Sequence, residues 1–250
     1  MQINFCPSPN FGLRPYDAAI SILVLHYTGM KTAAAALERL CDPVAEVSSH
    51  YFIEEDGRIT KLVDEDKRAF HAGISCWRGR AAVNDVSIGI ELVNPGHEFG
   101  YRAFPAAQMH ALIELSKQII ARHPAITPRN IVGHSDVAPL RKIDPGELFD
   151  WRALAEEGIG VWPETQKVSN PTHVLLKRED RGENVQAMQQ MLATIGYHLR
   201  VDSYFGEKTA EVVTAFKRHF VPEQLNGNWD MLAQARAVKL LAMPEFRGER

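Results

Sequence analysis

The first half of the chain alternates short apolar runs with helical patterns, and this alternation limits the possible folds more than any other feature. SILVLHY (21–27) precedes the helical pattern KTAAAALERL (31–40), and the β-branched run VSIGIELVN (86–94) predicts a central strand. Apolar side chains at helical spacing follow in residues 105–123, and NIVGH (130–134) predicts a further strand. The pattern predicts an α/β fold, with a mixed β-sheet flanked by helices.

A change of pattern divides the 250 residues into two domains. Periodicity is lost in GIGVWPETQKVSNPTHV (158–174), which is rich in Gly, Pro, Asn and Thr and predicts a linker. Two amphipathic helical stripes and a third helix at about 231–242 follow. We therefore expect a larger domain in residues 1–160, a linker in 161–174 and a small three-helix domain in 175–250.

Composition excludes several classes of protein. A formal net charge of -3, with Lys and Arg scattered along the chain, argues against nucleic acid as a partner. The longest apolar run, AAISILVL (18–25), is far shorter than the roughly 20 residues of a transmembrane segment. Cys6, Cys41 and Cys76 are too few and too widely spaced for a thiolate metal cluster or a disulfide framework, and they do not identify the redox compartment.

Three polar residues follow apolar strands in a pattern that suits a metal. His26 ends the strand ILVLH and His134 ends NIVGH, so the two imidazoles would meet at one sheet edge if these strands are neighbours. Asp144 lies ten residues after His134, in GHSDVAPLRKIDPG (133–146), a segment too irregular to predict a helix. Two histidines and one carboxylate with an open fourth position form a catalytic zinc set. The alternative is two hydrogen-bonded histidines and an ordinary Asp-Pro-Gly turn.

Two further charged residues suit catalysis. Glu91 interrupts the otherwise apolar run SIGIELVN, and a buried carboxylate needs a cation, a metal-bound water or a raised pKa. A structural salt bridge is the alternative. In extended backbone Lys142 points to the same side as Asp144, where a lysine could stabilise an oxyanion, although a solvated loop lysine has the same local pattern.

Several motifs together resemble the type 2 N-acetylmuramoyl-L-alanine amidases, the AmpD/AmiD-like branch related to peptidoglycan recognition proteins. The matching segments occur in the family's order: LHYT (25–28), SSHYFIEEDG (48–57), HAGISCWRGR (71–80), NDVSIGIELVN (84–94) and GHSDVAPLRKIDPG (133–146). The resemblance implies that His26, His134 and Asp144 bind Zn²⁺, that Glu91 is the general base and acid, and that Lys142 polarises the substrate. Further residues near these motifs are candidates for contacts with sugar and stem peptide: His50, His71, Trp77, Arg78, Asn84 and Arg141. Trp77 in the core and His71 hydrogen-bonded to a zinc ligand are the alternatives for those two.

The second half of the chain is similar to the three-helix peptidoglycan-binding domain. The matching segments are RGENVQAMQQMLATIGY (181–197), DSYFGEKTAEVVTAFKRHF (202–220) and NGNWD (226–230). The resemblance implies that this domain binds the polymeric wall. The alternative is a helical domain that only packs on its neighbour, because amphipathic helices need no ligand to explain them.

The resemblance implies hydrolysis of the amide bond between N-acetylmuramic acid and L-alanine, with peptidoglycan or muropeptides as the partner. A recognition protein that binds muropeptide without cleaving it, and a zinc endopeptidase that cuts within the stem peptide, are the alternatives. A wall-binding domain favours the cell envelope, in the periplasm. MQINFCPSPN has no signal-peptide pattern, which favours the cytoplasm instead. The sequence does not predict the oligomeric state.

Overall fold

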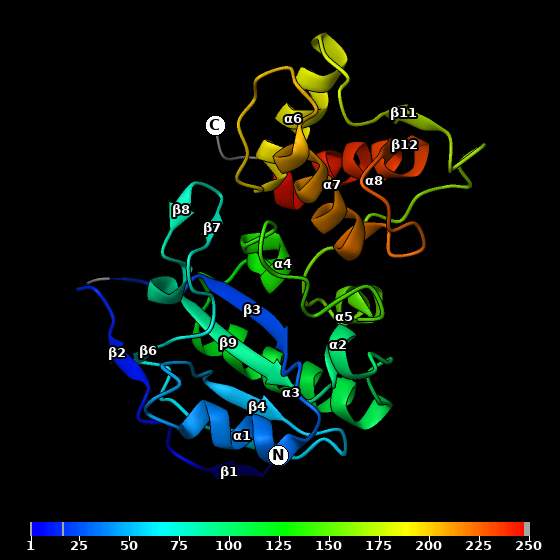
Figure 1. Ribbon diagram of the computed structural model, residues 1–250. Coiled ribbons are helices and arrows are strands. Elements are labelled where there is room, and N and C mark those ends of the chain that lie inside the picture. Colours follow the sequence, from blue (N-terminus) through cyan, green and yellow to red (C-terminus); the bar gives the residue numbers. More distant parts are fainter. Residues whose placement is uncertain (1, 17, 248–250) are drawn as a thin grey trace.

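The computed structural model describes residues 2–16 and 18–247, and its centre is a six-stranded sheet (Figure 1). The strand order is β1-β5-β4-β9-β3-β10. The bounds are β1 (Ile3–Phe5), β3 (Ile22–Tyr27), β4 (Tyr51–Ile53), β5 (Ile59–Lys61), β9 (Ser87–Leu92) and β10 (Ile131–Gly133). Strands β4, β9, β3 and β10 run parallel to one another, whereas β4 and β5 form an antiparallel hairpin. The sheet is therefore mixed, as predicted.

Helices and smaller strands surround this sheet. The helices of the N-terminal part are α1 (Ala33–Cys41), α2 (Gly96–Phe99), α3 (Ala106–Arg122), α4 (His134–Val137) and α5 (Trp151–Glu156), with short 3-10 turns at Val83–Val86 and Pro128–Asn130. Two small antiparallel pairs join β2 (Phe11–Leu13) to β6 (Lys67–Ala69) and β7 (Cys76–Trp77) to β8 (Arg80–Ala81). The predicted helices at 31–40 and 105–123 are confirmed by α1 and α3.

The two faces of the sheet differ in what they pack against. Along β3, Leu23 and Leu25 belong to the hydrophobic core between the sheet and α3, whereas Ile22 and Val24 face the opposite side of the sheet. Because side chains alternate along a strand, His26 continues the second face. Figure 1 shows α3 behind the sheet and α1 in front of it. Polar residues of the central strands are thus directed away from α3.

The C-terminal part consists of three helices and one short strand pair. Its elements are α6 (Glu183–Ile195), α7 (Glu207–Phe220), α8 (Met231–Ala242), the antiparallel strands β11 (Val174–Leu176) and β12 (Trp229–Asp230), and a 3-10 turn at Pro244–Phe246. The helical prediction for this region is confirmed, but the sequence did not predict β11 and β12. Lys217 lies fully buried in this region and pairs with Asp230.

The core of the helical region continues into the sheet. One cluster of buried side chains joins Val185, Val213 and Phe216 to Val24 and Val132 on the face of the sheet opposite α3. In Figure 1, α4 and α5 lie between the sheet and the C-terminal helices. Within residues 2–16 and 18–247, no helix is long and apolar enough to span a membrane.

One sequence expectation about local structure was wrong. Residues 133–146 were expected to contain no helix, but His134–Val137 form the single helical turn α4. The Asp136 carboxylate accepts a hydrogen bond from the backbone N–H of Gly133 at 2.7 Å, which closes this turn. A side-chain bond of this kind starts a helix without any apolar periodicity, so the sequence pattern did not reveal it.

A half-buried carboxylate links the end of α3 to strand β4 of the sheet. Glu65 accepts hydrogen bonds from Tyr51 Oη at 2.6 Å, from Arg122 Nη2 at 2.6 Å and from His123 Nε2 at 2.6 Å. Burial alone would raise the pKa of Glu65, but the hydrogen bonds from Arg122, Tyr51 and His123 outweigh it and lower the pKa from 4.5 to about 2. The charged form of Glu65 therefore stabilises the fold.

We predict that Glu65→Gln makes the free energy of unfolding less sensitive to a fall in pH in the acid range. Because the folded-state pKa lies below the ordinary value, the carboxylate contributes fully above pH 4.5 and loses its contribution as the pH falls towards 2. The wild-type protein should exceed the variant in free energy of unfolding by about 1–3 kcal/mol at neutral pH, and the difference should shrink below about pH 4. Urea unfolding at several pH values measures this, with Glu38→Gln on the exposed side of α1 as the control. A difference that stayed constant down to pH 3 would contradict the assignment.

Candidate active site

Parallel pairing brings the two predicted histidine ligands together. Strand β10 pairs directly with β3, with Gly133 opposite Leu25, so His26 and His134 both lie at the carboxyl edge of the sheet. This neighbour relation was a condition of the sequence-based prediction, and the structure fulfils it. Asp144 reaches the same place from the loop after α4, where its backbone carbonyl accepts a hydrogen bond from Ser135 N at 2.9 Å.

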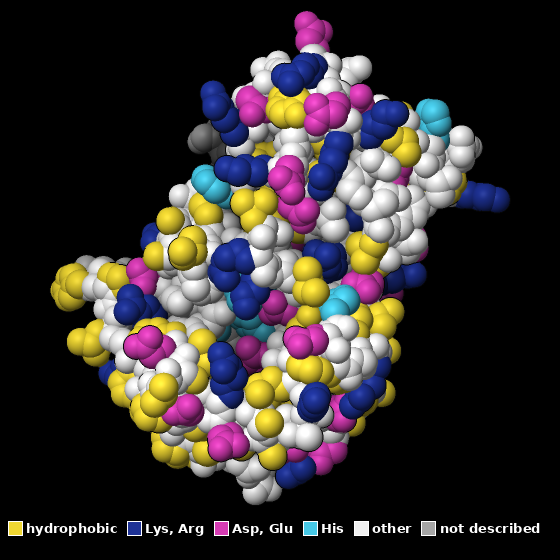
Figure 2. Space-filling view, viewed as in Figure 1, with side chains coloured by type: hydrophobic (Ala, Val, Ile, Leu, Met, Phe, Trp, Pro, Cys, Tyr) yellow, Lys and Arg dark blue, Asp and Glu magenta, His cyan; other side chains and the backbone are white. Residues whose placement is uncertain are grey.

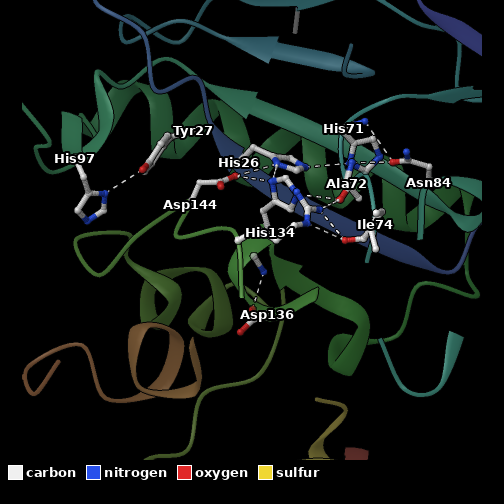
Figure 3. Close-up of polar contacts among 12 residues, drawn as sticks. His26, Tyr27, His71, Ala72, Ile74, Asn84, His97, His134, Asp136 and Asp144 are labelled. Atoms are coloured by element: carbon white, nitrogen blue, oxygen red, sulfur yellow. Dashed lines mark hydrogen bonds and ion pairs between the residues drawn. The ribbon is translucent and has the colours of Figure 1, made fainter. Parts of the chain in front are cut away.

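The three side chains form a compact set of ligand atoms (Figure 3). His26 Nδ1 lies 3.0 Å from His134 Nδ1 and 3.0 Å from Asp144 Oδ2, and His134 Nδ1 lies 3.1 Å from the same Oδ2. Ligands at Zn–N distances of about 2.0–2.1 Å in a tetrahedral site lie about 3.3 Å apart. The donor types and the spacing of the triangle therefore fit zinc, with the fourth position left to water or substrate. All three residues are buried.

Hydrogen bonds on the far side of each imidazole orient these atoms. His26 Nε2 lies 3.0 Å from His71 Nδ1, and His71 Nε2 lies 3.1 Å from Ser87 Oγ. His134 Nε2 lies 3.1 Å from the carbonyl oxygen of Ala72. A carbonyl oxygen only accepts, so we assign the His134 proton to Nε2, and the chain through His71 to Ser87 allows the same tautomer for His26. Both Nδ1 lone pairs are then available to a metal.

Burial sets the charge state of the cluster. Burial, followed by the neighbouring His134, lowers the pKa of His26 from 6.5 to about 4. Burial and the neighbouring histidines also lower the pKa of His71 well below its usual value. For Asp144, burial raises the pKa, but His134 and His26 outweigh it, so the carboxyl remains ionised. Neutral imidazoles beside an anionic carboxylate are the protonation states that a metal cation requires.

Glu91 lies beside this triangle. It is directly opposite His26 in the parallel pairing of β3 with β9, and it lines a cavity that also contains His134 and Asp144 in its wall. Its Oε2 atom is buried and has no hydrogen-bond partner among the residues that the structure describes. Burial, and then the Asp144 carboxylate, raise the pKa of Glu91 well above its usual value, and Lys142 lowers it in part. An unpaired buried carboxylate oxygen is costly, and it is typical of a site that binds a water or a substrate.

A cavity of about 650 Å³ opens over these residues. Glu91, His134, Lys142 and Asp144 line it, and Arg39 and Leu40 of α1 belong to its wall. Figure 2 shows the molecule hollowed here, with histidine and acidic side chains at the base and basic side chains at the rim. The volume is typical of a small-molecule or peptide-fragment site.

Two of the predicted substrate contacts lie at this cavity. His71 and Arg141 are among its lining residues. His71 also holds His26, the role that the sequence left as an alternative. Arg141 donates from Nη2 to the carbonyl oxygens of Ala72 and Ile74, both at 2.7 Å, and so fixes the loop that His134 contacts.

The other four predicted substrate contacts lie elsewhere. His50 is fully buried against Arg14 and accepts a hydrogen bond from Gly89 N at 3.0 Å. Asn84 Oδ1 accepts from Ala72 N at 2.8 Å, so it supports a loop behind the cavity. Trp77 packs on Tyr197 with ring centroids 5.3 Å apart, and Arg78 N donates to Gly196 O at 2.9 Å. The structure does not place these four among the residues that line the cavity, and each is engaged inside the protein or against the helical region. Substrate contact by these residues therefore stays a prediction.

Sequence reasoning missed a group of aromatic residues at the cavity. Tyr27 Oη lies 3.0 Å from His97 Nδ1, and the His97 ring stacks on Tyr101 with centroids 4.2 Å apart. Tyr27 and His97 line the cavity. Tyr27 is the last residue of β3, which carries His26, and His97 lies shortly after β9, which carries Glu91. Proximity to the carboxyl end of a strand was therefore the available signal.

Comparison with known proteins identifies the class of protein. Residues 16–147 match the family described as N-acetylmuramoyl-L-alanine amidase, and residues 181–231 match the putative peptidoglycan binding domain. The amidase match spans more than half of the chain. The chain therefore belongs to the N-acetylmuramoyl-L-alanine amidase family, as the sequence motifs indicated.

Individual relatives agree with this assignment. The chain is 41% identical over 234 residues to N-acetylmuramoyl-L-alanine amidase AmiD of Escherichia coli, which covers 89% of this chain and 82% of that protein. The solved structure of the E. coli AmiD complex with the substrate anhydro-N-acetylmuramic acid-L-Ala-D-gamma-Glu-L-Lys aligns with a TM-score of 0.76, at 40% identity, over 92% of each chain. The Pseudomonas aeruginosa AmpDh3 complex with anhydromuramic pentapeptide aligns with a TM-score of 0.73, at 31% identity, over 91% of this chain and 93% of that one.

We predict that Gly89→Ala weakens metal binding. A Cβ atom at residue 89 would lie 2.4 Å from the His71 ring, so the ring must move away from His26. Loss of such outer support typically costs about 10–100-fold in metal affinity. Competition with a chromogenic chelator measures the zinc dissociation constant. Gly227→Ala is the matched control, because a Cβ there meets its neighbours at 3.6 Å or more. A folded Gly89→Ala protein with wild-type affinity would remove His71 from the supporting role.

Proposed function

We propose that the protein is a zinc-dependent amidase that hydrolyses the bond between the lactyl group of N-acetylmuramic acid and L-alanine in peptidoglycan or muropeptides. The observation that carries the proposal is the triangle of His26, His134 and Asp144 beside the unpaired Glu91 oxygen inside one cavity. Family membership supports the bond that is cut, and the muropeptides bound in the two related structures support the substrate class.

Zinc is the metal that suits this ligand set best. Zn²⁺ is commonly bound by imidazole nitrogens together with a carboxylate oxygen. Mg²⁺ and Ca²⁺ are harder cations and prefer sites made of oxygen ligands. When bound, zinc supplies a Lewis acid and lowers the pKa of water at the site to about 7.

Glu91 moves the protons in this scheme. Its carboxylate accepts a proton from the attacking water and then gives that proton to the leaving amine of L-alanine. The raised pKa of Glu91 suits both steps, because a group that titrates nearer neutral pH can act as base and acid in turn.

Lys142 stabilises the charge that forms on the substrate. Its side chain is partly exposed at the cavity and close enough to lower the pKa of Glu91. No side-chain ion pair engages it within the described part of the chain. The ammonium group therefore remains available to the carbonyl oxygen as negative charge develops there.

The two parts of the chain divide the task. We assign catalysis to residues 1–160, a linker to 161–174 and wall binding to 175–250. The match of residues 181–231 to a putative peptidoglycan binding domain supports the wall-binding role. A protein with both activities acts in the cell envelope, and peptidoglycan rather than nucleic acid is its partner.

We predict that Glu91→Gln retains zinc but loses hydrolysis by about 10²–10⁴-fold, because the amide cannot accept the proton of water. Mass spectrometry of peptides released from purified sacculi and from anhydromuramyl tripeptide measures the loss, and metal analysis measures the zinc. Glu98→Gln is the matched control, since Glu98 lines the same cavity but is exposed. Activity retained in Glu91→Gln would exclude Glu91 as the proton carrier.

The same product analysis separates the other candidate activities. An amidase releases intact stem peptides that begin with L-alanine. An endopeptidase releases shorter fragments and leaves L-alanine on the sugar. A zinc-loaded wild-type protein that bound sacculi and released nothing would be a recognition protein, and the proposed activity would be wrong.

A further inference from the structure

A buried carboxylate connects the metal-ligand segment to the C-terminal helical region. Asp136 is fully buried and lies two residues after His134, in the same helical turn. Its Oδ1 accepts a hydrogen bond from Tyr197 Oη at 2.6 Å, and its Oδ2 accepts from His219 Nδ1 at 2.7 Å. Tyr197 follows α6 and His219 belongs to α7. Two of the donors that satisfy this carboxylate therefore come from residues more than 60 positions away.

The third donor lies next to the metal ligand. Gly133 N donates to Asp136 Oδ2 at 2.7 Å, and Gly133 directly precedes His134. One oxygen of Asp136 thus accepts from both the helical region and the backbone that carries the ligand. In Figure 3, Asp136 points away from the metal-ligand side chains, so the turn presents His134 on one side and Asp136 on the other.

The two donors from the helical region are themselves packed among aromatic rings. The His219 ring is stacked on Trp151 and on Phe220, with centroids 3.7 Å and 3.8 Å apart. Tyr197 is held edge-on against Trp77. A buried carboxylate that loses a donor in such an apolar setting must move or become solvated, because an unpaired charge is strongly unfavourable there. The helical turn that holds His134 would move with it.

We infer that the helical region is part of the metal site, with Tyr197 and His219 acting through Asp136 as positioning residues for His134. The inference rests on the proposed metal site and goes beyond it, since wall binding by the helical region does not require this role. It also predicts that the helical region is docked in one orientation and is not a freely tethered module.

The test compares zinc affinity with thermal stability in the full-length protein. Tyr197→Phe removes one donor and keeps the ring, and His219→Phe removes the other and keeps the stacking. We expect each to lower zinc affinity by about 10-fold and the double variant by about 100-fold, measured by chelator competition at a temperature where all variants are folded. His219→Asn, which retains a donor near the position of Nδ1, should recover part of the affinity.

Two controls separate positioning from stability. Tyr204→Phe removes an exposed hydroxyl that bonds to Glu179 in the same region. Val213→Ala removes buried methyl groups from the helical core, six residues before His219 in α7, and lowers the melting temperature while it leaves the three hydrogen-bond donors of Asp136 in place. Zinc affinity should be unchanged in both. Unchanged affinity in the Tyr197/His219 double variant, or an equal loss in Val213→Ala, would overturn the inference alone. A wild-type protein that bound no zinc would overturn the proposed function as well.

A second inference rests on a different observation, the proximity of two cysteines. Cys6 Sγ and Cys41 Sγ lie 3.8 Å apart, at the end of β1 and the end of α1. Neighbouring bonds hold the two segments together, because Ser8 Oγ donates to Leu40 O at 2.5 Å and Asn10 Nδ2 donates to Asp42 O at 2.8 Å. Both cysteines are partly exposed, so a small oxidant can reach them.

We propose that Cys6 and Cys41 are a disulfide site. Each thiol loses one proton and one electron as the S–S bond forms, and the two electrons reduce one molecule of a small disulfide, such as oxidised glutathione, to two thiols. Burial and the contact with Cys6 raise the pKa of Cys41 to about 11, which makes the reaction slow. The bond would join the first strand to α1, whose Arg39 and Leu40 form part of the cavity wall.

Prolonged incubation with oxidised glutathione, then alkylation and peptide mass mapping, tests the site. We expect a linked Cys6–Cys41 peptide, a free or glutathionylated Cys76, and a melting temperature higher by roughly 10 °C. Cys6→Ser should abolish the shift and Cys76→Ser should leave it intact. Cys6 and Cys41 that both remained reduced, or that each carried glutathione at equilibrium, would overturn the proposal.

Discussion

The structure depends on the parallel pairing of β9, β3 and β10. These strands are covered on both faces, so a polar side chain among them is costly unless it has a partner. Alternation along the strands directs Leu23 and Ile88 towards α3, and directs His26 and Glu91 to the other face, where loops and the helical region meet the sheet. The requirement that a buried imidazole have hydrogen-bond partners explains the chain of contacts from His26 through His71 to Ser87, whereas Glu91 keeps an unpaired oxygen. The position of the candidate metal site therefore follows from the face of the sheet that carries these polar groups.

The sequence predicted the parts of this arrangement that depend on local pattern. The strands that carry His26, Glu91 and His134 are apolar runs that end in, or are interrupted by, a polar residue, and the period of two already places each side chain on a face. The positions of Trp77 and His50 depend instead on tertiary contacts. An aromatic residue next to an arginine in the sequence is compatible with a sugar-binding site and with a buried core position. For Trp77, the packing against Tyr197 shows that the position is a core position. His50 precedes β4 and pairs level with Gly89 inside the sheet, so it lies away from the carboxyl edge.

The segment 133–146 shows how closely spaced polar residues divide between tasks. His134 and Asp144 point to one centre, whereas Asp136 turns towards the helical region and Arg141 holds the loop at Ala72. Lys142 faces the cavity, and no side-chain ion pair engages it within the described residues. The density of polar residues predicts a functional segment, but the direction of each side chain follows from α4, which begins the segment and has no apolar periodicity in its sequence.

Docking of the helical region changes how two binding sites on one chain can cooperate. A flexible linker raises the local concentration of substrate over a broad range of geometries, whereas a fixed orientation helps only when the polymer presents its sites at the matching distance and angle. The shared core and the bonds to Asp136 favour the fixed case. Two sites in a fixed orientation can still bind polymeric peptidoglycan well, because the repeating polymer presents many pairs of positions at the required distance. The fixed orientation also avoids the entropy cost of ordering a linker each time the protein binds. In a rigid arrangement, strain in the helical region would reach His134 through Asp136, so the proposed wall-binding and metal sites would share one structural element.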